Sequence, residues 1–133
     1  MIAGSVVSTK SAAVTVAYAL AGWALCVATM GVGMRMTSLE NALSVHAVAA
    51  PVFFAALSFF YFHRETSWPP LYAATVFLGV VMFMDVFVVA LFIERSFAMF
   101  ESILGTWLPF LLIFVSTWWT GLAVRRTTHR AAA

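Results

Sequence analysis

Long apolar stretches separated by short polar ones are the dominant pattern of this chain. Four such stretches can be marked, at residues 12–34, 41–62, 71–93 and 102–124. An α-helix needs roughly 20 apolar residues to cross a hydrocarbon core about 30 Å thick, and each stretch meets that length. The pattern therefore predicts four transmembrane helices.

The connections between these stretches are short and polar, and few residues lie outside the stretches. Short connections make consecutive helices run antiparallel. We therefore expect an all-α integral membrane protein, a four-helix up-down-up-down bundle in which residues 1–133 form a single transmembrane domain.

Composition agrees with a lipid environment. Hydrophobic residues make up 64% of the chain and charged residues 9%, and the mean hydropathy is +1.02. A soluble domain has about a quarter of its residues charged. The expected partner is thus a lipid bilayer, and the net charge of +2 gives no indication of nucleic-acid binding.

Basic residues are distributed unequally between the two ends of the predicted bundle. The end that holds both termini carries Lys10, Arg64, Arg125, Arg126 and Arg130, and the other end carries Arg35 and Arg95. Because Lys and Arg favour the cytoplasmic side, both termini are predicted to be cytoplasmic. The opposite end is called outer here.

One acid, Asp85, lies inside the third stretch, and His46 lies inside the second. By the helical rise, Asp85 is about 12 Å and His46 about 8 Å from the outer ends of their helices. Burying an unpaired carboxylate at this depth costs at least about 2.5–3.5 kcal/mol, so an intramembrane acid is expected to face the bundle interior and to have a partner. We expect the two side chains on adjacent antiparallel helices at comparable depth.

Two interpretations of Asp85 stay open. In the first, Asp85 is protonated or bonds a hydroxyl such as that of Thr29, and serves helix packing. In the second, Asp85 and His46 build an outward-facing polar cavity that binds or moves a proton, a cation or a small ligand. The expected cavity wall consists of Thr29, Met30, Met82 and Trp107, and the expected cavity mouth consists of Glu40, Glu94, Glu101, Arg35 and Arg95.

Cofactor binding receives little support. A bis-histidine haem b needs two histidines on different helices at one depth, and His46, His63 and His129 do not provide this within one chain. The thioethers of Met30, Met34, Met36 and Met82, together with His46, would suit Cu(I). Methionine is also a common packing residue, so copper stays open, the metal is unknown and no cofactor is predicted.

Three functional hypotheses follow. The first is the ligand or proton cavity of Asp85 and His46, in a homo-oligomer or larger membrane complex, because four helices are few for alternating access. The second is an accessory or assembly subunit of a larger membrane complex. The third is a small membrane enzyme acting on a lipid or isoprenoid, with Asp85 and His46 as acid and base. No catalytic motif supports the third, so the sequence favours a non-enzymatic role without deciding the matter.

The segments "LENALSVHAVAAPVFF", "MDVFVVALFIERS" and "GTWLPFLLIF" resemble those of uncharacterised small four-span bacterial integral membrane proteins. The resemblance covers roughly residues 15 to 122. It implies a multi-pass protein of the bacterial inner (plasma) membrane, and it implies no activity, cofactor or site residue.

Overall fold

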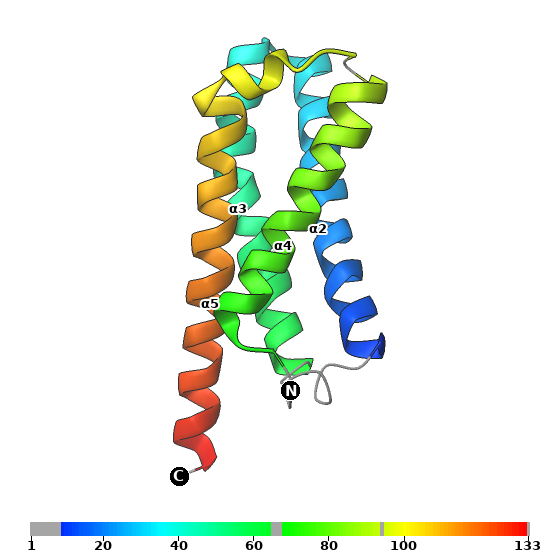
Figure 1. Ribbon diagram of the computed structural model, residues 1–133. Helices are drawn as coiled ribbons and strands as arrows, with labels where there is room; N and C mark the ends of the chain where they lie inside the picture. Colours follow the sequence, from blue (N-terminus) through cyan, green and yellow to red (C-terminus); the bar gives the residue numbers. More distant parts are fainter. Residues whose placement is uncertain (1–8, 65–67, 94, 133) are drawn as a thin grey trace.

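The computed structural model describes residues 9–64, 68–93 and 95–132, and every long element in these ranges is helical. The long helical segments lie side by side (Figure 1). In chain order the elements are α2 (Thr9–Met36), α3 (Leu39–Arg64), α4 (Pro70–Met84), the π-helix η1 (Asp85–Ile93), the 3₁₀-helix η2 (Ala98–Glu101), the π-helix η3 (Ile103–Trp107) and α5 (Leu108–Ala132).

Four of these segments are long and apolar enough to cross a membrane: Thr9–Met36, Leu39–Arg64, Pro70–Ile93 and Gly105–Thr127. They overlap the four stretches marked in the sequence. Large apolar side chains also lie on the outer surface of the bundle, as at Val48, Phe60 and Phe92. A helix that is apolar on its outward face as well as its inward face is typical of a membrane span. By these four spans the chain is a multi-pass membrane protein.

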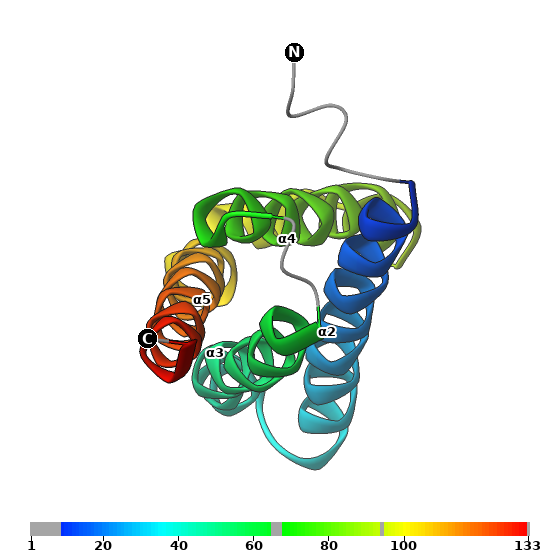
Figure 2. The ribbon, with the colours of Figure 1, turned by 90° about the horizontal axis from the view of Figure 1, so that it is seen from below.

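The four helices pack as a square (Figure 2). α2 and α5 lie at opposite corners, and each of them packs against both α3 and α4. α3 and α4 are consecutive in the chain but occupy the other two corners, on the diagonal. The expectation that the helices of His46 and Asp85 are adjacent is therefore wrong.

Chain length explains how consecutive helices come to lie on a diagonal. The chain between Arg64 and Pro70 can extend about 20 Å. Helices packed about 8–10 Å apart have a diagonal of about 11–14 Å, which this connection can reach. A short connection thus fixes the antiparallel direction of α3 and α4 without making them neighbours.

Aromatic rings fill the diagonal in the half of the bundle that holds both termini, called the terminal end. Phe54 of α3 and Phe77 of α4 have ring centroids 6.1 Å apart, and Tyr61 and Phe77 have centroids 5.2 Å apart. Tyr61 also shares a 2.7 Å hydrogen bond with the hydroxyl of Thr15 on α2. All four side chains are fully buried. The terminal end is therefore closed by packing between α2, α3 and α4.

Small residues let α2 approach this aromatic centre. The buried positions of α2 are Ser11, Thr15, Ala19, Gly22 and Cys26. A Cβ atom at Gly22 would lie 2.4 Å from Cζ of Phe54, so the ring rests directly on the helix backbone. Rows of small residues allow such close contacts between membrane helices.

Candidate functional site

A cavity of about 450 Å³ lies inside the half of the bundle opposite the termini, called the far end. It extends from Ile113 and Val81 near mid-bundle to Ser96 and Ala98 in the segment between η1 and η2. Side chains of all four spans line it, and most of them are apolar. Its size falls in the range of about 300–1,000 Å³ that small-molecule sites occupy.

The cavity forms because the far end lacks the large side chains that fill the terminal end. α3 buries Ala42, Ala47 and Ala50 there, and η1 buries Ala90. Gly105 lies on the α5 side, where a Cβ atom would be 3.0 Å from Leu43. These residues bring the backbones together at the edges of the square but do not reach its centre.

Asp85 projects into this cavity from the first residue of η1. Its Oδ1 accepts a hydrogen bond of 3.0 Å from Nε1 of Trp23 on α2. Both side chains are half-buried. Within the described residues, no ion pair is formed by Asp85, so a neutral indole is the group that holds this carboxylate.

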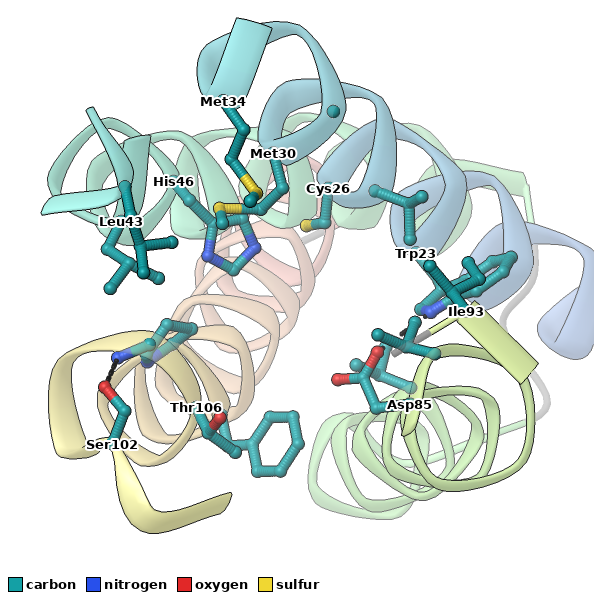
Figure 3. Close-up of a pocket in the computed structure, with 18 of the residues that line it drawn as sticks. Trp23, Cys26, Met30, Met34, Leu43, His46, Asp85, Ile93, Ser102 and Thr106 are labelled. Carbon is teal, nitrogen blue, oxygen red and sulfur yellow. Dashed lines mark hydrogen bonds between the residues drawn. The ribbon is translucent and has the colours of Figure 1, made fainter. Parts of the chain in front are cut away.

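His46 lines the same cavity from α3. Figure 3 shows its ring on a different wall from Asp85, with the cavity between them. No hydrogen bond joins the two side chains in the described part of the chain. The Nδ1 atom of His46 is buried and has no hydrogen-bond partner among the described residues. The two titratable groups thus share one cavity without touching.

Two π-helices border the cavity. Such segments are rare and occur frequently at functional sites. In η3 the cause is local: Pro109 has no N–H to continue an α-helical ladder, and the N–H of Leu108 donates to the carbonyl of Ile103. Asp85–Ile93 contains no Pro or Gly, and its β-branched residues lower α-helical propensity only slightly.

The end of η1 turns the chain over the cavity. Arg95 has a positive φ of 53°, which only a small fraction of non-glycine residues adopt. The N–H of Ser96 donates a 2.9 Å hydrogen bond to the carbonyl of Ala90. This pairing resembles a helix cap closed by a left-handed residue. It directs Ser96 and Ala98 toward the cavity, where both are lining residues.

Four of the five residues expected at the cavity mouth lie outside the cavity. Glu40, Glu101, Arg35 and Arg95 are exposed, and none of them is a lining residue. They lie at helix ends and in the connecting segments, where their charges stay in contact with water. Glu94 lies outside the described residues.

Of the four residues expected in the cavity wall, Met30 lines the cavity and the other three do not. The hydroxyl of Thr29 donates to the carbonyl of Leu25 in its own helix, and Met82 packs against the hydrophobic core. Trp107 is 47% exposed, and its Nε1 donates to the carbonyl of Phe100. The side chains of Thr29, Met82 and Trp107 are thus held in places that do not face the cavity.

Cys26, Ser102 and Thr106 line the cavity but were not identified from the sequence as parts of this site. For Trp23, the indole N–H needs an acceptor, and the sequence left open whether this residue serves packing or forms a wall of a ligand pocket. In the structure Trp23 is the partner of Asp85 and lines the cavity. The other three carried no distinguishing pattern.

Among the described residues, no group of three His, Cys, Asp or Glu side chains could hold a metal ion. Comparisons with known protein families, with curated proteins and with solved structures find no match to this chain.

Proposed function

We propose that this protein binds a positively charged ligand, a cation or a small cationic molecule, in the far-end cavity. The observation that carries the proposal is the placement of Asp85, a carboxylate that faces the cavity and is held by Trp23. Neither Lys nor Arg is among the lining residues. Apart from the imidazole of His46, the cavity therefore offers an acid without a basic side chain to pair with it.

Electrostatics favours a cation at this place. An ionised carboxylate inside a membrane protein is stabilised by hydrogen bonds and by an opposite charge. Trp23 provides one hydrogen bond and no charge. A bound cation provides the missing charge, and it gains from the low dielectric of its surroundings.

The remaining walls select for a weakly hydrated ligand. Val27, Leu43, Val89 and Phe110 are among the lining residues, and apolar walls do not replace the water shell of a strongly hydrated ion. Aromatic faces, in contrast, attract cations within about 6 Å of the ring. A soft metal ion or an organic cation with an apolar body fits these walls better than a small hard ion does.

We also propose an orientation of the bundle in the membrane. Lys10, Arg64, Arg125 and Arg126 lie at the terminal end, and Arg35 and Arg95 lie at the far end. Because basic residues favour the cytoplasm, the terminal end faces the cytoplasm of a bacterium in its inner membrane. The cavity then lies on the periplasmic side. We further propose that the chain works in a homo-oligomer or a larger complex. The reason is that four helices are few for moving a ligand across the membrane.

Binding of tetraphenylphosphonium to the purified full chain in detergent tests the proposal. We expect Asp85→Asn to weaken binding of this cation at least about tenfold, which corresponds to about 1.4 kcal/mol. Glu40→Gln is the matched control, because it removes an equal charge from an exposed acid outside the cavity. Equal affinities for the wild-type chain and Asp85→Asn, with both proteins folded, contradict the proposal.

A further inference from the structure

We propose that the α2 wall of the cavity, together with His46 of α3, is a binding site for a soft monovalent metal ion, Cu(I) or Ag(I). The inference rests on the proposed function, because it names the class of cation that the cavity takes. The site is defined by the side chains of Cys26, Met30, Met34 and His46, all of which line the cavity.

Three sulfur atoms form a row along α2. Cys26, Met30 and Met34 are spaced by four residues, and residues four apart lie on the same face of a helix. The rise between successive members is about 6 Å. Since all three residues are cavity-lining, this face of α2 presents a thiol and two thioethers to one space.

His46 is level with the middle of this row. α2 and α3 are antiparallel neighbours, and a Cβ atom at Gly33 would lie 3.0 Å from Cβ of Ala42. About one turn back along α2 from Gly33 is Met30, and about one turn forward along α3 from Ala42 is His46. Figure 3 shows Met30, Met34 and Cys26 on the side of the cavity where His46 lies.

The imidazole has a free ligand atom. Nδ1 of His46 is buried and has no hydrogen-bond partner among the described residues. A buried polar atom without a partner carries a free-energy cost of about 1–3 kcal/mol. Coordination of a metal ion through Nδ1 itself removes that cost. The thioethers of Met30 and Met34 supply the other ligands.

The donor set selects the metal. Thioether, thiol and imidazole groups favour Cu(I), whereas Ca²⁺ and Mg²⁺ take oxygen ligands. Asp85 lines another part of the same cavity and balances the positive charge at a distance.

Methionine is also a common packing residue, and the chain contains a matched control for that role. Met82 is partly buried, packs against the hydrophobic core and does not line the cavity. Met→Leu replacements nearly conserve side-chain volume and are usually tolerated in a core. Met82→Leu therefore removes a thioether without removing a cavity-lining donor.

Titration of Ag(I) into the full chain in detergent, followed by calorimetry, tests the inference without a reductant. We expect the wild-type chain to bind one Ag(I), and Met30→Leu combined with Met34→Leu to weaken binding at least about tenfold. Met82→Leu should stay within about twofold of the wild-type chain. Equal affinity of the double variant and the wild-type chain overturns the inference, as does a wild-type chain that binds no Ag(I).

X-ray absorption of the chain loaded with Cu(I) gives a second readout. We expect both sulfur and imidazole nitrogen around the metal, with the nitrogen lost in His46→Gln. A metal surrounded by oxygen overturns the inference. If tetraphenylphosphonium binds through Asp85 and Ag(I) does not bind, the metal site fails while the proposed function stands. If Asp85→Asn leaves tetraphenylphosphonium binding unchanged, the proposed function fails.

Discussion

Trp23 and Asp85 are joined by a hydrogen bond of 3.0 Å, in which the indole Nε1 donates to the carboxylate Oδ1. The bond connects α2 to the residue at which α4 passes into η1, and α2 and α4 are neighbours in the square. It fixes the cavity acid with a donor that carries no charge.

Trp23→Phe keeps an aromatic ring and removes this donor. A hydrogen bond to a charged group contributes about 1.5–3 kcal/mol, so we expect the free energy of unfolding in detergent to fall by about that amount. In an Asp85→Asn background the same replacement should cost about 1 kcal/mol less, because the acceptor is then neutral. Denaturant titrations of the four proteins measure this coupling. Zero coupling contradicts the expected role of the bond.

Filling the cavity should exclude its ligand. Val89 lines the cavity, and its neighbour Val88 does not. We expect Val89→Phe to weaken tetraphenylphosphonium binding at least about tenfold, since the larger ring occupies space that the ligand needs. Val88→Phe makes the same change of volume outside the cavity and should leave the affinity unchanged. Equal effects of the two replacements would show that ligand binding does not depend on the cavity volume.

Replacing two glycines by alanine distinguishes the effect of close packing on stability from the effect of helix propensity. A Cβ atom at Gly22 meets the Phe54 ring, whereas a Cβ atom at Gly79 meets no atom within 4 Å. We expect Gly22→Ala to destabilise the bundle by about 1–3 kcal/mol through overpacking. Gly79→Ala should be neutral or stabilising by up to about 1 kcal/mol. Thermal unfolding followed by circular dichroism compares the two, and a tolerated Gly22→Ala contradicts the close α2–α3 contact.

The buried hydroxyl pair of Thr15 and Tyr61 should contribute to stability. Their oxygens are 2.7 Å apart, and the Thr15 hydroxyl also donates to the carbonyl of Ser11. Because Thr15 keeps that second partner, we expect Tyr61→Phe to cost only about 0.5–1.5 kcal/mol. Tyr72→Phe, at a side chain that is 55% exposed, should cost nothing measurable. If Tyr72→Phe lowered the free energy of unfolding and Tyr61→Phe did not, the expectation would be wrong.

The proposed orientation predicts which end of the bundle reacts with an impermeant maleimide. Cys26 is buried, and Cys26→Ala gives a background without cysteine. In intact spheroplasts we expect labelling of Ser38→Cys, at the far end, and no labelling of Arg126→Cys until the membrane is permeabilised. The reverse result would place the cavity on the cytoplasmic side.

Hydropathy alone identified the four spans, because the length of an apolar run is a local property of the sequence. Which helices become neighbours was not predictable in this way. The square arrangement depends on side chains far apart in the chain, such as Phe54 against Gly22 and Phe77, and short connections do not determine it.

The candidate site was predictable in part. The cost of burying a charge pointed to an inward-facing Asp85, and its depth pointed to the half of the bundle that also contains His46. The partnership with Trp23 required knowledge that α2 packs against α4, at whose end Asp85 lies. The sequence of Asp85–Ile93 does not predict a π-helix, since this segment contains neither Pro nor Gly.

The diagonal placement of α3 and α4 has a consequence for biogenesis. As the spans are made one after another, the third packs along the first and meets the second only across the diagonal, through rings such as Phe54 and Phe77. The rings of Phe54 and Phe77 then lack their cover on one side until α5 arrives. The square of helices is therefore complete only once the last span is made, because α5 packs against both α3 and α4.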